Sequence, residues 1–147
     1  MTLSAQHEMI RDTVRKFARE ELAPHAARWD RESHFPREAL KGLAQMGLYG
    51  VAVPEQWDGA GMDSTALALA IEEIAAGDGA TSTIVQVNNL VAGIVNGYGS
   101  AAQKESFLRP LARGEMLGAF CLTEPHTGSD AGAITTRAER MGGEYVI

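Results

Sequence analysis

The stretch Phe120–Asp130, which reads FCLTEPHTGSD, takes the chain from an apolar segment into a polar loop. A sharp turn is expected at Glu124 and Pro125, because proline restricts both its own backbone and that of the residue before it. Thr127–Asp130 then offer hydroxyls and backbone N–H groups in one concave patch. Such a patch suits the oxygens of a phosphate or of a polar heterocycle.

After Gly114 the spacing of apolar residues changes to the period of β-strands, and it keeps this period on both sides of the stretch. A chain seldom stops inside an apolar strand, because an unpaired strand edge invites aggregation. We therefore expect residues 115–147 to be the incomplete start of a β-domain in a longer protein. The predicted elements are strands at Leu117–Leu122 and Ile134–Glu139, a turn at Arg140–Glu144 around Gly142-Gly143, and the start of a strand at Tyr145–Ile147.

Upstream, apolar residues recur at helical spacing, which predicts a helical domain over residues 1–114. The predicted fold class is therefore mainly α, with about five helices followed by the first strands of the β-domain. The fourth helix is apolar nearly all round, so it is expected in the middle of the fold. The expected features are a cap at Ser4, a bend at Pro24, a helix start at Pro36, a cap at Asp63 or Ser64, an inner face of Ile84, Val87, Val91 and Ile94, a capping box of Ser100 and Gln103, and inward-facing Phe107, Leu108 and Leu111.

Composition excludes several classes of protein. The chain has 147 residues, 45% of them hydrophobic and 22% charged, which is typical of a globular protein. Its net charge of −6 argues against nucleic acid or an anionic membrane as a partner. Cys121 is the only cysteine, so no disulfide can form within the chain. No basic-then-apolar leader opens the sequence, and the longest apolar region, residues 83–95, is too short and too polar to span a bilayer, so a cytoplasmic protein is expected.

The Phe120–Asp130 motif resembles the flavin-binding signature of acyl-CoA dehydrogenases. The resemblance continues through Phe17–Pro24, Gly47–Glu55 and Ile71–Ala75, in the family's order and spacing, and covers essentially the whole chain. It implies an FAD-dependent flavoprotein of fatty acid metabolism, an oxidoreductase that dehydrogenates acyl-CoA thioesters. The partners that it implies are acyl-CoA, electron-transferring flavoprotein as electron acceptor, and other copies of the protein in a homotetramer. It also implies that the catalytic base lies in a C-terminal domain, so this chain is expected to be inactive alone and to hold no catalytic residue.

The family's flavin contacts match five positions of this chain. By the resemblance, Phe120 flanks the isoalloxazine ring, where the family often has tyrosine. Leu122 and Thr123 offer backbone N–H groups to the pyrimidine oxygens, with the Thr123 hydroxyl near the reactive flavin nitrogen. Gly128 and Ser129 match the turn that meets the FAD pyrophosphate, and Ser129 also matches a contact with bound acyl-CoA.

Other polar residues near the motif are expected to be structural. Glu124 precedes a proline and is expected to brace the turn, while Asp130 is expected to accept backbone N–H bonds in its loop. Cys121 alternates with its neighbours, so it is expected to be a small core residue on the opposite face of the strand. None of the four histidines has the spacing of a metal ligand, so no metal site is expected.

Two questions stay open at this stage. Gln86, Asn88 and Asn89 lie on the apolar fourth helix, where the resemblance places the inner end of the acyl pocket; a hydrogen-bond network between helices explains these amides equally well. Thr83, Ile84 and Gln86 would limit acyl chain length in the first case. The alternatives for function are an acyl-CoA oxidase, nitroalkane oxidase or flavin monooxygenase on the same scaffold, and a non-catalytic helical interaction module.

Overall fold

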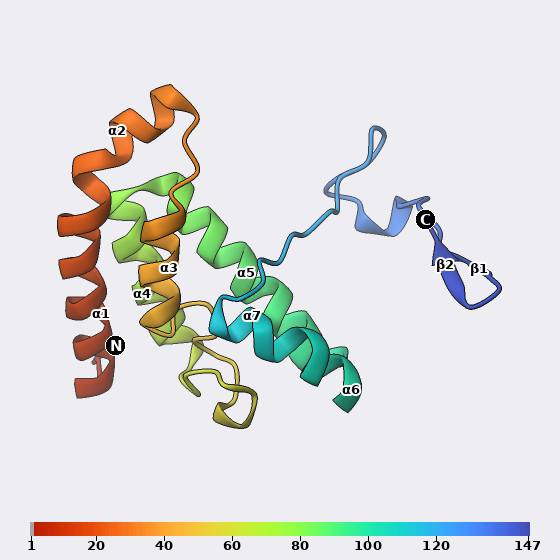
Figure 1. Ribbon diagram of the computed structural model, residues 1–147, viewed down its shortest axis with the longest axis horizontal. Helices are drawn as coiled ribbons and strands as arrows, with labels where there is room; N and C mark the ends of the chain where they lie inside the picture. The colour runs from red at the N-terminus through yellow and green to blue at the C-terminus, as the bar shows by residue number, and fades with distance from the viewer. Residues whose placement is uncertain (1) are drawn as a thin grey trace.

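A computed structural model describes residues 2–147 (Figure 1). Helices pack into a body over residues 5–113, called here the helical body, and the remaining chain extends away from it as an arm. The prediction of a mainly α fold is confirmed. In chain order the elements are α1 (Ala5–Phe17), a π-helical turn (Ala18–Leu22), α2 (Ala23–Glu32), α3 (Arg37–Gln45), a 3-10 turn (Glu55–Trp57), α4 (Ser64–Gly77), α5 (Gly79–Tyr98), α6 (Ala101–Gln103), a second π-helical turn (Lys104–Leu108), α7 (Arg109–Arg113), a 3-10 turn (Ala131–Ala133), β1 (Glu139–Met141) and β2 (Glu144–Val146).

The ends of the helices follow the capping residues of the sequence. The Ser4 hydroxyl accepts the His7 N–H, and the His7 ring accepts the Ser4 N–H in return, which forms a capping box. Asp63 caps α4 and Asp78 caps α5, each by accepting an N–H three residues later. The predicted capping box of Ser100 and Gln103 is confirmed as well.

The core forms where α1, α3, α4 and α5 meet. Val14, Leu43, Ile74 and Val85 are fully buried there, and each contributes about 1.5–3 kcal/mol by leaving water. A bidentate pair also joins α1 to α4, because Arg15 Nε and Nη2 lie 2.9 and 2.6 Å from the carboxylate oxygens of Glu73. Small residues on α4, Ala66 and Ala70 among them, let α1 approach it closely.

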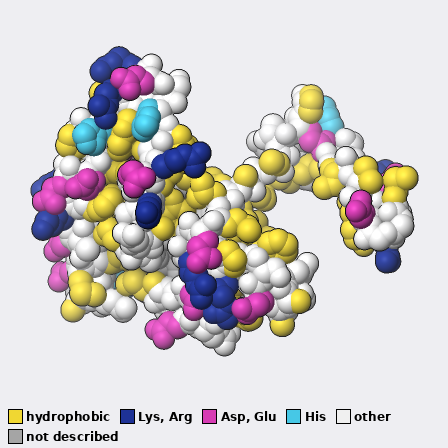
Figure 2. All heavy atoms as spheres, in the orientation of Figure 1, with side chains coloured by type: hydrophobic (Ala, Val, Ile, Leu, Met, Phe, Trp, Pro, Cys, Tyr) yellow, Lys and Arg dark blue, Asp and Glu magenta, His cyan; other side chains and the backbone are white. Residues whose placement is uncertain are grey.

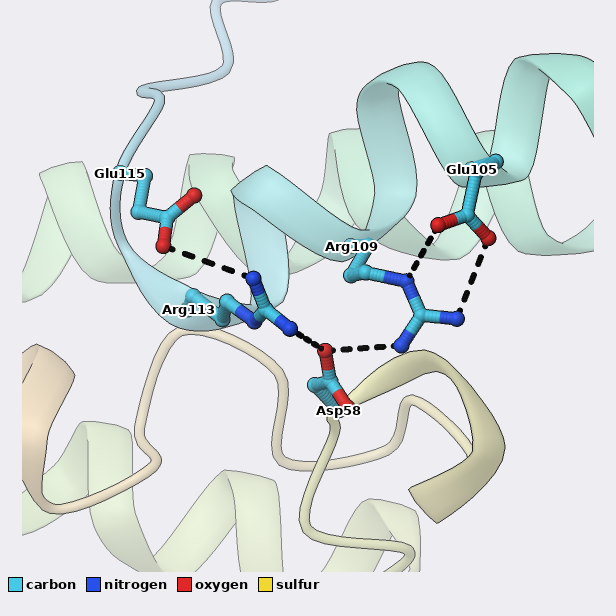
Figure 3. A network of polar contacts seen from close by, with 5 residues as sticks. All are labelled: Asp58, Glu105, Arg109, Arg113 and Glu115. Atoms are coloured by element: carbon cyan, nitrogen blue, oxygen red, sulfur yellow. Dashed lines mark hydrogen bonds and ion pairs between the residues drawn. The ribbon is translucent and has the colours of Figure 1, made fainter.

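The loop between α3 and α4 is fastened to α7 by charged groups (Figure 3). Asp58 Oδ2 lies 2.8 Å from Arg109 Nη1 and 2.6 Å from Arg113 Nη2. Arg109 also lies over the Trp57 ring, with its guanidinium carbon 5.4 Å from the ring centroid. The hydrogen bond from Arg109, with the charges of both arginines, holds the pKa of Asp58 below its ordinary value. Trp57 and Asp58 therefore hold this loop down on the helical body.

The predicted inner face of α5 is wrong. Its buried residues include Thr81, Val85, Asn88 and Ala92, whereas Ile94 is 38% exposed. Ile84, Val87 and Val91 are only half-buried. The amide side chains turn inward because they satisfy backbone groups of neighbouring segments, so the apolar stripe lies nearer the surface. Phe107, also expected to point inward, is 48% exposed.

The arm contains less sheet than the sequence predicts. A strand needs a hydrogen-bonded neighbour, and none of residues 2–147 pairs with Leu117–Leu122. Ile134–Glu139 is likewise not a strand except at Glu139, where β1 begins and pairs antiparallel with β2 across the turn at Gly142-Gly143. Apolar side chains gather along the segment that leaves the helical body (Figure 2). Between residues 2 and 147, none of the helices has the length and apolar character needed to cross a membrane.

Candidate functional site

The motif closes into a compact loop over residues 124–136, called here the Glu124 loop. Glu124 and Thr127 exchange two backbone hydrogen bonds, of 2.9 and 3.2 Å, so that Pro125 and His126 form the corner of a tight turn. The Thr127 hydroxyl then donates to the Asp130 carbonyl at 2.6 Å, and the Ala133 N–H donates to the same carbonyl at 3.0 Å. The sharp turn predicted at Glu124 and Pro125 is confirmed.

The carboxylate of Glu124 holds the two ends of this loop together. Its Oε1 accepts the Thr136 N–H at 2.8 Å, and its Oε2 accepts both the N–H and the hydroxyl of Thr135 at 3.0 Å. The side chain is only 12% exposed. Hydrogen bonds from Thr136 and then Thr135 lower the pKa of Glu124 to about 2. Glu124 is thus a brace, as expected, and both of its oxygens are occupied by the loop.

Two neighbouring expectations are corrected. The backbone carbonyl of Asp130 accepts the loop's hydrogen bonds, and no donor among residues 2–147 bonds to its carboxylate. Cys121 is exposed and is no core residue, because the segment around it forms no sheet and so has no buried face.

The residues expected to contact a flavin lie on the exposed side of the segment and its loop. Phe120 is 47% exposed and Leu122 is 37% exposed, while Thr123 and Ser129 are also exposed. The loop folds back so that a Cβ added to Gly128 would lie 3.5 Å from the Thr123 methyl group, which brings these two residues together. Within residues 2–147, no hydrogen bond is made by the backbone N–H groups of Leu122, Thr123, Gly128 and Ser129, or by the hydroxyls of Thr123 and Ser129.

These donors lie on Leu122–Thr123 and on the part of the Glu124 loop that folds back to Thr123 at Gly128, and they form one exposed edge. A set of free N–H groups and hydroxyls beside an exposed aromatic ring fits a ligand with an apolar ring system, carbonyl oxygens and phosphates. No group of histidine, cysteine and acidic residues within the described chain could hold a metal ion.

The sequence left two readings open for the amides of α5, and the structure places Asn88 and Asn89, but not Gln86, in a hydrogen-bond network. Asn88 is fully buried and Asn89 is 8% exposed, whereas Gln86 is exposed. The Asn88 amide donates to the carbonyls of Tyr49 and Leu111, and the Asn89 amide donates to that of Leu48. The signal for this role in the sequence was the position of these amides on an otherwise apolar helix, where buried amides need partners.

The sequence model of the family described as "Acyl-CoA dehydrogenase, N-terminal domain" matches residues 4–115, about three quarters of the chain. The chain belongs to this family. It is 42% identical over 146 residues to the mitochondrial short-chain specific acyl-CoA dehydrogenase of Rattus norvegicus, a match that covers 99% of this chain and 35% of the relative. This acyl-CoA dehydrogenase N-terminal domain thus spans about a third of the length of the curated relatives it matches.

Solved structures agree with this family membership. A glutaryl-coenzyme A dehydrogenase in complex with glutaryl-CoA superposes with a TM-score of 0.92 at 36% identity, which covers 99% of this chain and 38% of the other. A structure of the electron transferring flavoprotein of Acidaminococcus fermentans, from work on flavin-based electron bifurcation, gives a TM-score of 0.93 at 33% identity, with 99% of this chain and 39% of the other covered. The acyl-CoA dehydrogenase fold therefore extends through the arm as well as the helical body.

Proposed function

We propose that this chain is the N-terminal part of an FAD-dependent acyl-CoA dehydrogenase. The family match and the two acyl-CoA dehydrogenase relatives support the reaction class. The observation that carries the proposal is the exposed edge formed by Leu122–Thr123 and the Glu124 loop, where Thr123, Gly128 and Ser129 offer donors with no partner in the described chain. In this proposal residues 1–114 are the helical domain, and residues 115–147 begin the flavin-binding β-domain.

The residues of this edge fit FAD by their chemistry. Phe120 and Leu122 present apolar surface to a ring system, and the N–H groups of Leu122 and Thr123 suit its carbonyl oxygens. The Thr123 hydroxyl is free to donate to a ring nitrogen. Gly128 and Ser129 suit a pyrophosphate, because charge-assisted bonds from N–H and O–H groups to phosphate are among the stronger hydrogen bonds.

When bound, FAD supplies the acceptor for the hydride that leaves the β-carbon of the acyl group. The α-proton must leave to a carboxylate at the same time, so that an α,β double bond forms with both hydrogens accounted for. Both oxygens of Glu124 are used within the loop, which argues against it as this base. We infer that the base comes from outside this chain, as the family resemblance implies, and that the task of this chain is to bind and orient.

The partners follow from the same proposal. Acyl-CoA is the substrate, with Ser129 as a contact to it as well as to FAD. Electron-transferring flavoprotein is the proposed electron acceptor, and a homotetramer is the proposed assembly.

The test uses a protein that contains this chain at its N-terminus and has the full length of the relatives. Flavin absorbance of the purified protein checks for FAD. Thr123→Ala is expected to retain FAD and to change the rate of flavin reduction by acyl-CoA. Ser129→Ala should weaken binding of FAD or acyl-CoA by about 1–3 kcal/mol, since a charge-assisted bond is lost.

The matched control is Ser106→Ala, an exposed serine of the second π-helical turn in the helical body, outside the proposed site. Its FAD affinity and reduction rate should equal those of the parent. A full-length protein without flavin absorbance, or variants at Thr123 and Ser129 that behave like this control, would refute the proposed site.

A further inference from the structure

Asn88 ties three separate segments together from the middle of α5. Its Nδ2 donates to the carbonyl oxygens of Tyr49 at 3.1 Å and Leu111 at 3.2 Å. Its Oδ1 accepts the N–H of Gly118 at 2.9 Å. The side chain is fully buried, so every one of its bonds is protected from competition with water.

Asn89, the next residue, makes the same kind of contacts but only within the helical body. Its Oδ1 accepts the Val51 N–H at 3.1 Å, and its Nδ2 donates to the carbonyls of Leu48 and Val85 at 2.8 and 2.9 Å. The two neighbours thus have equal chemistry and similar burial. They differ in that Asn88 alone reaches the arm.

A second observation marks the same point of the chain. A Cβ added to Gly118 would lie 2.7 Å from Val91 Cβ, with the two methyl carbons of Val91 at 3.0 and 3.1 Å. The backbone of Gly118 therefore lies directly against α5, where only glycine fits. Gly118 is therefore held in place both by its close contact with Val91 and by its hydrogen bond to Asn88.

Gly118 is also the last attachment of the arm. Among the described residues, no hydrogen bond joins residues 119–147 to the helical body. Phe120 follows two residues later and Thr123 five residues later, so both are carried by an extended segment that starts from this anchor. A segment of five residues can span about 17 Å, so the anchor keeps Thr123 within that distance of Gly118, and loss of the anchor lengthens the tether.

We propose that Asn88 is the positioning residue for the flavin segment. It fixes where the arm leaves the helical body and thereby holds Phe120 and Thr123 in place relative to α5. One consequence of this inference rests on the proposed function: FAD should bind more weakly when the segment is free. The reason is that binding must then order the segment, and the entropy lost in doing so opposes binding. The anchoring itself is testable without any cofactor.

The first experiment measures arm mobility in the 147-residue chain. Cys121 is the only cysteine, it is exposed, and it lies three residues beyond Gly118, so a nitroxide attached to it reports on the anchor. Asn88→Ala should give a more mobile electron paramagnetic resonance spectrum and about tenfold faster amide exchange at Gly118. Asn89→Ala should lose similar stability and keep the parent's spectrum. Spectra of both variants that superpose on that of the parent, or that change equally, overturn the proposal.

A second variant keeps the test valid if Asn88→Ala fails to fold. Gly118→Ala leaves the Asn88 side chain intact and drives the segment away from Val91. The control is Gly93→Ala on α5, where an added Cβ meets nothing within 4 Å. Gly118→Ala should mobilise the label and Gly93→Ala should not. A label as immobile in Gly118→Ala as in the parent overturns the proposal.

The third measurement separates this inference from the proposed function. In a protein of full family length, Asn88→Ala and Gly118→Ala should raise the dissociation constant of FAD about tenfold and shift the flavin absorbance, while Asn89→Ala at equal folded fraction leaves both unchanged. A full-length parent that binds no FAD refutes the proposed function and leaves the label result standing. FAD affinity that falls equally in all three variants overturns the positioning role of Asn88.

Discussion

Gly114 follows α7 at the end of the helical body and packs closely against Ala44 of α3. A double-mutant cycle can test this contact. Gly114 has a φ of 71°, and an added Cβ would lie 2.4 Å from Ala44 Cβ on α3. Gly114→Ala thus introduces a left-handed alanine, which costs about 1–2 kcal/mol. It also introduces an overlap with Ala44 that costs about 1–3 kcal/mol. The total expected loss in the free energy of unfolding is about 2–5 kcal/mol.

Ala44→Gly removes the methyl group on the other side of this contact. Alone it should cost about 1 kcal/mol, because glycine disfavours α3. In the double variant the overlap disappears, since the nearest remaining atom of residue 44 is its Cα at 3.6 Å. The double variant should therefore be about 1–3 kcal/mol more stable than the sum of the single changes predicts.

Urea unfolding followed by circular dichroism at 222 nm measures all four proteins of this cycle. The parent and Ala44→Gly calibrate the helix effect, and the double variant isolates the contact. Single changes that add to within about 0.5 kcal/mol would show that the contact between Gly114 and Ala44 does not limit packing there.

Three further outcomes are expected. The folded-state pKa of Glu124 lies at about 2, below its ordinary value of 4.5. The hydrogen bonds from Thr135 and Thr136 to its carboxylate are therefore fully stabilising above pH 4.5 and are lost as the pH falls through about 2. Amide exchange at Thr135 and Thr136 should stay slow at pH 3.5 and match that of Glu124→Ala near pH 1.5. The pKa of Asp58 is also lowered, so Asp58→Asn should reduce stability at neutral pH and flatten the acid limb of the stability curve below about pH 4, and an unchanged limb in acid titrations would contradict the role of Arg109. Isothermal titration of the 147-residue chain should detect no stoichiometric FAD, and an acyl-CoA assay no turnover, because one exposed edge offers too few contacts to offset the cost of immobilising the ligand; tight binding or turnover would show that this edge suffices.

Much of the helical body follows from local signals in the sequence. Ser4, Asp63 and Ser100 cap the helices that they were expected to cap, because capping depends on neighbours within three residues. The orientation of α5 could not be obtained in this way. Its apolar residues surround it, so the hydrophobic pattern has no preferred side, and the buried face is chosen by Asn88 and Asn89.

In the candidate site too, features that depend on neighbouring residues were predicted, and contacts between distant segments were not. The turn and the brace at Glu124 were predicted, because residues 124–127 interact over a short distance in the chain. The strands at Leu117–Leu122 and Ile134–Glu139 were not found, because a strand depends on a partner that the local pattern does not specify. The contact of Asn88 with Gly118 spans thirty residues and has no local signal.

The π-helical turn at Ala18–Leu22 keeps a single buried face running from Val14 of α1 to Leu22 at its own end. Val14 and Leu22 are both fully buried although they are eight positions apart in the chain. At about 100° per residue, eight regular helical steps would leave Leu22 about 80° away from Val14 around the axis. The widened turn absorbs one residue, so the effective separation is seven steps and the deviation falls to about 20°. The turn is thus an internal register correction: deleting one residue from it should restore a regular helix with Leu22 still facing the core, whereas a deletion in the middle of α4 would rotate Ile74 away from it.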